Sequence, residues 1–245
     1  CVMKKISTND SEIKNNVVSD GEIKNNEKCF PQNVVQHEIK IMNLFNNDNI
    51  IQLYGYFFHE NSYYLILEYG GIDFWEILKG LETEYKEVKT NLKNIFRQMT
   101  QAVHICHQEG IMHRDIKLEN FVYNPETGIV KLIDFGFATN KKIADKRVGT
   151  LIYMAPEIYN VSSSSFYGHN VDIWSLGCVL YTLTLGHPPF HERELKSKNI
   201  LQGLARVKRT LISKYDDILV DLILNMLTLT NRYTTSKILS HNYFK

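Results

Sequence analysis

The sequence predicts an α+β fold made of two lobes, a small lobe rich in strands and a larger lobe made mostly of helices. Segments with strand character gather before Gly70, and longer helix-periodic segments follow it. The chain has 245 residues, 44% of them hydrophobic, which is enough for one large domain or for two lobes that share a cleft. We therefore expect residues 1–69 to form the first lobe and residues 70–245 the second.

The first lobe is expected to hold a strand, a polar insertion, a helix and a hairpin. Residues 1–6 are typical of the end of a strand, and the asparagine-rich stretch 7–33, in which EIKNN occurs twice, indicates a solvated insertion. Apolar residues at helical spacing predict a helix over 34–45. The HEN between the apolar runs 50–58 and 63–69 indicates a hairpin.

Three long helices are expected in the second lobe. Residues 92–108 and 217–229 carry apolar side chains at helical spacing, and residues 171–185 are strongly apolar. The nearly apolar run 173–185 is too short to span a membrane. The sequence therefore predicts a helical second lobe and no membrane span.

Overall charge and cysteine usage narrow the function classes. The formal net charge is +1 and the isoelectric point is about 7.8, which argues against nucleic acid or a membrane surface as the partner. Cys1, Cys29, Cys106 and Cys178 form no CxxC pair, so we expect free thiols in a reducing compartment and no zinc site. No signal peptide is visible, and we expect a cytoplasmic location, with the nucleus as the alternative.

Three short motifs occur in order along the second lobe. HRDIKLEN occupies residues 113–120, LIDFG occupies 132–136, and MAPE occupies 154–157. A lone HRD or DFG tripeptide is more often an ordinary loop than a site. Together and in this order they indicate phosphoryl transfer from a nucleotide.

The residue types in these motifs suit that reaction. Phosphoryl transfer needs an acceptor hydroxyl aimed at the γ-phosphorus and cations that hold the triphosphate. Asp115 can orient the hydroxyl and take its proton, and Lys117 can neutralise the transferring phosphate. Asn120 and Asp134 offer oxygen ligands of the kind that Mg²⁺ prefers.

On these motifs the sequence resembles eukaryotic protein kinases of the serine/threonine type, from Val2 to its last residue apart from 7–33. The resemblance implies the bilobal protein kinase fold, ATP and Mg²⁺ as cofactors, and protein substrates. HRDIKLENFVYN, GTLIYMAPEIY and the final HNYF are most similar to calcium/calmodulin-dependent and calcium-dependent kinases. ILEYGGIDFWEIL also resembles spindle-checkpoint dual-specificity kinases.

The resemblance assigns further residues to ATP. Val2-Met3-Lys4 resembles the strand with the ATP-binding lysine, and Glu38 resembles the helix glutamate that pairs with it, with Lys5 as the rival lysine. Glu38 lies in a helix-periodic segment, unlike the competing acids Glu12, Glu22 and Glu27.

The segment after residue 66 matches the family's adenine-binding stretch. There the Glu68 carbonyl and the Gly70 amide are expected to bond adenine. Asp73 is either a ribose contact or a helix cap.

Other matches concern the scaffold and the substrate. Asp172 resembles the buried aspartate that holds the HRD backbone, and Glu157 and Arg232 resemble the family's ion pair. Lys117 and Thr150 match serine/threonine kinases, in which that threonine bonds the catalytic aspartate and lysine. An apolar stack that forms in the active state is matched by Met42, Leu53, His113 and Phe135.

The family's glycine-rich loop, GxGxxG, would lie upstream of Lys4, and the chain does not include it. We expect the sequence to be an N-terminally trimmed view of a normal kinase, with the first lobe partly missing at its start. The alternative is a pseudokinase that works as a nucleotide-binding or scaffolding module.

Regulation is suggested by Arg114, since in the family such an arginine usually receives a phosphate from the activation loop. Between Gly136 and Gly149 the one hydroxyl belongs to Thr139, too near the start to be the usual phosphosite. We expect Asp145 or a bound partner to substitute for the phosphate. The alternative is that Asp145 is merely solvated.

Overall fold

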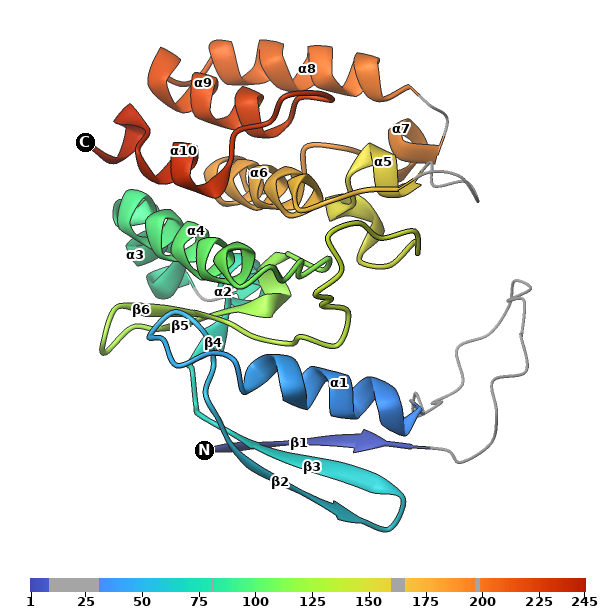
Figure 1. Ribbon diagram of the computed structural model, residues 1–245. Helices are drawn as coiled ribbons and strands as arrows, with labels where there is room; N and C mark the ends of the chain where they lie inside the picture. The colour runs from blue at the N-terminus through green and yellow to red at the C-terminus, as the bar shows by residue number, and fades with distance from the viewer. Residues whose placement is uncertain (9–30, 81, 160–165, 197–198) are drawn as a thin grey trace. The chain divides into compact units, whose positions relative to one another are not determined.

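The computed structural model forms two compact units (Figure 1), which are described separately below. The predicted insertion 7–33 and Cys29 fall largely or wholly outside the residues that the structure describes. Those described residues are 1–8, 31–80, 82–159, 166–196 and 199–245. The first unit contains residues 1–47 and 51–69, and the second contains 48–50 and 70–245. The lobe limits 1–69 and 70–245 stay a prediction, from which the two units differ at residues 48–50.

The first unit is a three-stranded antiparallel sheet with one helix. Strands β1 (Val2–Ser7), β3 (Ser62–Leu67) and β2 (Leu53–His59) lie in the order β1-β3-β2. Helix α1 (Gln32–Met42) is linked to β3 by a hydrogen bond that Gln36 Nε2 donates to the Tyr63 hydroxyl at 3.1 Å. The helix begins two residues earlier than the apolar pattern predicts and ends before the expected limit.

The hairpin predicted from HEN is present, although its turn is shorter than three residues. His59 pairs with Ser62, so only Glu60 and Asn61 form the turn, with φ of 44° and 54°. Two successive positive φ values are typical of the type I′ turn, whose twist matches that of the strands. Asn tolerates this left-handed conformation, which explains why the turn forms here.

The second unit contains a small sheet and most of the helices. Strands β4 (Ile72–Asp73), β5 (Phe121–Asn124) and β6 (Ile129–Leu132) pair antiparallel in that order. Its helices are α2 (Phe74–Gly80), α3 (Glu82–Thr90), α4 (Leu92–Gln108), α5 (Pro156–Tyr159), α6 (Asn170–Leu185), α7 (Glu192–Lys196), α8 (Ile200–Ile212), α9 (Asp217–Met226) and α10 (Thr235–Leu239).

Helix α4 covers the β5–β6 hairpin, as Figure 1 shows. The Gln98 side chain on α4 fixes this contact. Its Nε2 donates to the Gly128 carbonyl at 2.9 Å, and its Oε1 accepts from the Val130 amide at 2.9 Å. The loop residues 113–120 lie between α4 and β5 in the chain.

Helix α6 is the centre of the second unit. All of its residues from Val171 to Thr184 are buried, so it lacks a solvent-facing side over that stretch. Gly177 lies so close to α9 and its C-terminal end that an added Cβ would come within 2.9 Å of Leu227. The helix ends at Gly186, whose φ of 83° is the left-handed C-cap that glycine favours.

The predicted α+β class is therefore confirmed, with a small antiparallel sheet in one unit and a mainly helical second unit. Among the described residues, no helix has the length and apolar character needed to cross a membrane. Cys106 and Cys178 lie on α4 and α6 as free, fully buried thiols, and burial raises the pKa of both.

Candidate active site

Asp115 lies at the centre of the HRDIKLEN loop, and both of its carboxylate oxygens have partners. Oδ1 accepts hydrogen bonds from the Thr150 amide at 2.9 Å and from the Thr150 hydroxyl at 2.8 Å. Oδ2 lies 2.7 Å from Lys117 Nζ, which also donates to the Thr150 hydroxyl at 3.1 Å. The expected bonds of Thr150 to the aspartate and the lysine are therefore present.

Gly149 explains how Thr150 approaches this loop. Its φ is 104°, and an added Cβ would lie 2.4 Å from the Arg114 carbonyl oxygen. A side chain at this position would be strained by the backbone conformation and would collide with main-chain atoms. Residue 149 must therefore be glycine for Thr150 to bond Asp115.

Asn120 and Asp134 are brought together by the main chain. The Ile133 amide donates to the Asn120 carbonyl at 2.8 Å, which places the next residue, Asp134, beside Asn120. Asn120 Nδ2 donates to the Asp115 carbonyl at 2.8 Å and to its Oδ2 at 3.2 Å. These two bonds use only the amide nitrogen of Asn120. Its amide oxygen and the exposed Asp134 carboxylate are oxygen donors of the kind that fits Mg²⁺.

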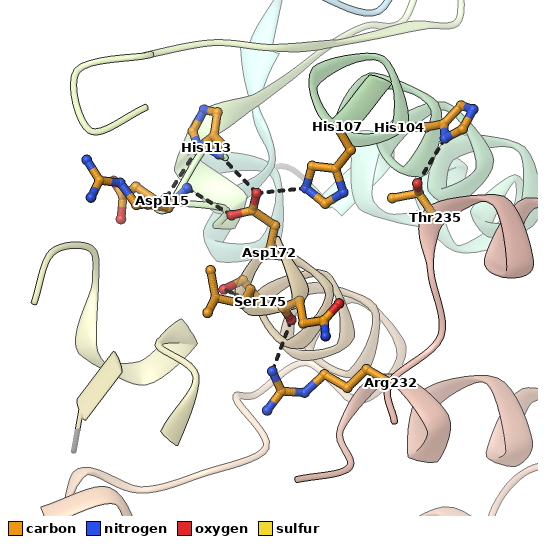
Figure 2. A network of polar contacts seen from close by, with 11 residues as sticks. His104, His107, His113, Asp115, Asp172, Ser175, Arg232 and Thr235 are labelled. Atoms are coloured by element: carbon orange, nitrogen blue, oxygen red, sulfur yellow. Dashed lines mark hydrogen bonds and ion pairs between the residues drawn. The ribbon is translucent and has the colours of Figure 1, made fainter. Parts of the chain in front are cut away.

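Asp172, at the start of α6, holds the backbone that precedes Asp115 (Figure 2). Its Oδ2 accepts from the His113 amide at 2.9 Å, and its Oδ1 accepts from the Arg114 amide at 2.8 Å. His107 Nε2 lies 2.9 Å from Oδ2, and because a carboxylate only accepts, this nitrogen carries the proton. The predicted role of Asp172 as a holder of the HRD backbone agrees with these contacts.

These hydrogen bonds decide the charge state of Asp172. Burial alone would raise the pKa of this fully buried carboxyl. The bonds from His107 and from the Arg114 amide, with the nearby imidazoles, outweigh burial and lower the pKa of Asp172 below its usual value. The carboxylate is therefore ionised at neutral pH, as its three donors require.

Three histidines around this network are held neutral. Burial lowers the pKa of His113, against the pull of the Asp172, Asp115 and Asp134 carboxylates. Burial and then the nearby His107 ring lower the pKa of His104 and of His169. The His107 and His169 rings meet edge to face, with centroids 4.8 Å apart.

We expect the protein to lose stability as the pH falls from 7.5 to 5.5. The folded pKa of each of these histidines lies below its unfolded value of about 6.5, so the unfolded chain binds more protons below that pH. For the fully buried His113 the loss is at most about 1.4 kcal/mol per pH unit. Thermal melting at several pH values measures the effect.

The matched variants for this experiment are His169→Gln and His59→Gln. His169→Gln should reduce the pH dependence of the melting temperature, whereas the change at the exposed His59 should leave it as in the wild type. A wild-type melting temperature that does not change between pH 7.5 and 5.5 would contradict the assignment.

In the first unit, Lys4 on β1 and Glu38 on α1 form an ion pair of 2.8 Å. Glu38 is buried, whereas the rival Lys5 is exposed. Glu12, Glu22 and Glu27 lie outside the described residues. The pairing expected between residues 4 and 38 is therefore present.

The residues expected to bond adenine are placed as follows. Glu68 directly follows β3, and its amide donates to the Gln52 carbonyl at 2.9 Å. Gly70 is buried at the start of the main segment of the second unit. Asp73 Oδ1 accepts from the Trp75 and Glu76 amides at 3.0 and 2.9 Å, so the structure contains the helix cap that was one of its two expected roles.

The expected ion pair between Glu157 and Arg232 is confirmed. Both guanidinium Nη atoms contact the carboxylate, Nη2 to Oε2 at 2.9 Å. Arg232 also donates to the Asn170 carbonyl at 3.0 Å and lies 4.9 Å from the Trp174 ring centroid. These contacts tie the MAPE motif, through Glu157, to the start of α6 and to the loop before α10.

The decisive observation is the match of the whole chain to one family: the sequence model of the protein kinase domain matches residues 2–244. The chain belongs to the protein kinase domain family. The resemblance stated from the HRD, DFG and MAPE motifs is thereby confirmed. The kinase domain described here carries those motifs on the loop 113–120, at the end of β6 and at the start of α5.

Curated relatives of this kinase domain include both serine/threonine and dual-specificity enzymes. It is 39% identical over 172 residues to dual specificity protein kinase TTK of Mus musculus, covering 63% of this chain and 19% of the relative. It is 35% identical over 225 residues to calcium-dependent protein kinase 5 of Plasmodium falciparum (isolate 3D7), covering 86% and 38%. With the human SNF-related serine/threonine-protein kinase it shares 36% identity over 195 residues, covering 78% and 25%.

This kinase domain thus spans less than two-fifths of the length of each of these relatives.

Two residues at its site were missed by the sequence analysis. His107 could have been suspected from its place in the last turn of α4, six residues before His113. Tyr167, considered below, follows a stretch without helical or strand periodicity, and no pattern in the sequence marks it.

Proposed function

We propose that this protein is an ATP-dependent protein kinase that transfers the γ-phosphate to serine or threonine hydroxyls of proteins. The observation that carries this proposal is the position of the Thr150 hydroxyl, which bonds both Asp115 and Lys117 at 2.8 and 3.1 Å. That threonine holds a carboxylate and an ammonium side by side, as in-line phosphoryl transfer requires.

Each side chain of the loop then has a distinct task. Asp115 orients the acceptor hydroxyl and accepts its proton, acting as the general base. Lys117 neutralises charge on the phosphoryl group in transfer. Asn120 positions Asp115 through the bonds of its Nδ2 and offers its amide oxygen to a cation.

The resemblance to protein kinases assigns residues to ATP and its cation. Lys4 would bind the α- and β-phosphates while Glu38 holds its ammonium in place, and Glu68 and Gly70 would offer a carbonyl and an amide to adenine. Asn120 and Asp134 would hold Mg²⁺, which supplies charge neutralisation of the triphosphate. The ion pair of 2.8 Å between Lys4 and Glu38 supports the first of these assignments.

Two alternatives remain. One is a pseudokinase that binds nucleotide or acts as a scaffold. The similarity to a relative named as a dual-specificity kinase favours some transfer to tyrosine. Both are outcomes of the experiment below.

We expect purified protein to incorporate labelled phosphate from ATP into a mixed protein substrate, and hydrolysis of the product to yield phosphoserine and phosphothreonine. Lys4→Met should abolish incorporation, whereas the matched change Lys5→Met should retain it, because Lys4 pairs with Glu38 and Lys5 is exposed. Absence of incorporation by the wild type would favour the pseudokinase. Substantial phosphotyrosine would favour dual specificity.

We further propose that the partners are ATP and protein substrates rather than nucleic acid or a membrane. The net charge of +1 supports this assignment. A cytoplasmic location, with the nucleus as the alternative, fits free thiols such as Cys106 and Cys178.

A further inference from the structure

The segment between Gly136 and Gly149, called here the activation segment, leads directly to Thr150. Its one hydroxyl side chain, Thr139, is only 6% exposed. Thr139 exchanges two main-chain hydrogen bonds with Met112, at 2.8 and 2.9 Å, and its Oγ1 accepts from the Lys141 amide at 3.3 Å. A modifying enzyme cannot reach this hydroxyl unless the segment opens, so another interaction must order the residues that follow.

Tyr167, just before α6, provides such an interaction. Its main chain exchanges two hydrogen bonds with Ala144, at 2.9 and 3.0 Å. Its hydroxyl donates to the Lys146 carbonyl. Tyr167 is only 4% exposed, so these bonds are shielded from water, and one residue holds the activation segment at two points.

The same hydroxyl meets Arg114, the neighbour of Asp115. Arg114 Nη1 donates to the Tyr167 hydroxyl at 3.4 Å, and Arg114 Nε donates to the Phe137 carbonyl at 2.7 Å. The guanidinium therefore connects the start of the activation segment with Tyr167. Because the Arg114 amide is bonded to Asp172, a displacement of Tyr167 is transmitted to the backbone that carries Asp115.

Charge explains why a neutral hydroxyl suits this place. The activation segment has a single acid, Asp145, and four exposed cations, which are Lys141, Lys142, Lys146 and Arg147. Arg114 adds a fifth positive charge nearby. Asp145 is exposed and is not an acceptor for Arg114, whose guanidinium is bonded to Phe137 and Tyr167 instead. The expected substitution of Asp145 for a phosphate is therefore not what the structure contains.

We propose that Tyr167 is a positioning residue that holds the activation segment against Arg114 by its hydroxyl, so that the site is ordered without an added phosphate. The inference rests on the proposed kinase function for its effect on turnover. The hydrogen bonds themselves do not depend on that function.

The test uses Tyr167→Phe, which removes the hydroxyl and keeps the ring, with Tyr243→Phe as the matched control. Tyr243 is also buried, and it lies in the C-terminal turn 242–244, away from the activation segment. We expect Tyr167→Phe to lower kcat about tenfold, with an unchanged KM for ATP and a raised KM for the protein substrate. Tyr243→Phe should match the wild type, and phosphatase treatment should leave wild-type activity intact.

A second readout does not need kinase activity. Trypsin cuts after lysine and arginine, so the four exposed cations are potential cleavage sites in the activation segment. The rate of cleavage at these sites therefore measures how often the segment opens. We expect Tyr167→Phe to be nicked faster between residues 141 and 147, as located by mass spectrometry, at a melting temperature close to that of the control.

The two readouts separate the proposals. Faster nicking in a protein that transfers no phosphate would support the role of Tyr167 and refute the proposed kinase function. Equal nicking and equal kcat in Tyr167→Phe and wild type would overturn the role of Tyr167, as would a loss of wild-type activity on phosphatase treatment.

Discussion

Asp115→Asn should lower kcat by about 10²–10⁴-fold, the usual contribution of a general base, and should leave the fold intact. The amide keeps an oxygen for Thr150, whose two bonds go to Oδ1. At the Oδ2 position, however, the new NH₂ group would face two donors, Lys117 Nζ and Asn120 Nδ2. The variant therefore loses both the proton acceptor and the ion pair with Lys117.

Steady-state transfer to a protein substrate measures this effect. Asp217→Asn, at an exposed position in the first turn of α9, is the matched control for the same chemical change and should keep wild-type turnover. Melting temperatures of the two variants should agree within a few degrees. If purified Asp115→Asn retained most of the wild-type kcat, Asp115 would not be the base.

Nucleotide binding should depend on a divalent cation through Asp134. A ligand at about 100 times its Kd stabilises a protein by about 2.7 kcal/mol, which corresponds to roughly 5–10 °C in a chain of this size. We expect such a rise for the wild type with ATP and Mg²⁺, and almost none with ATP and a chelator. Asp134→Ala should abolish the Mg²⁺-dependent part, because Asp134 brings the full negative charge, whereas Asn120 offers only an amide oxygen.

The backbone at residue 134 calls for a second variant. Asp134 has a φ of 61°, a left-handed conformation that Asn tolerates better than Ala. Asp134→Asn therefore removes the charge with less strain, and it should lose the Mg²⁺-dependent shift just as Asp134→Ala does. Equal shifts in the wild type and both variants, with and without Mg²⁺, would favour the pseudokinase.

Elements that depend on local pattern could be predicted from the sequence. Helix α6 was expected over 171–185 and spans Asn170–Leu185, because a long apolar run bounded by Gly186 leaves few alternatives. The hairpin was expected, but its two-residue turn was not, since Glu60 is an unusual residue at a positive φ. Helix α3 was missed because it is mostly charged and polar, with little apolar periodicity.

The candidate site divides in the same way. The HRD, DFG and MAPE motifs together led to the prediction of four site residues, Asp115, Lys117, Asn120 and Asp134. The roles of these residues stay proposals. Several of the hydrogen bonds that orient them join residues 33 to 59 positions apart, such as Lys117 with Thr150 and His113 with Asp172. Only the resemblance could anticipate those pairs. Nothing anticipated Tyr167, because its contacts depend on how two irregular segments meet.

The burial of α6 also governs when the site can form. A helix enclosed over nearly its whole length is stabilised by its neighbours rather than by its own propensity, so it gains its stability only when they pack around it. Asp172 on that helix lies 59 and 58 residues after His113 and Arg114, whose amides it holds. Arg232, which bonds the Asn170 carbonyl, comes later still in the chain. On a ribosome, the HRD loop therefore emerges well before Asp172, and these contacts cannot form until α6 and the segment that carries Arg232 have been made.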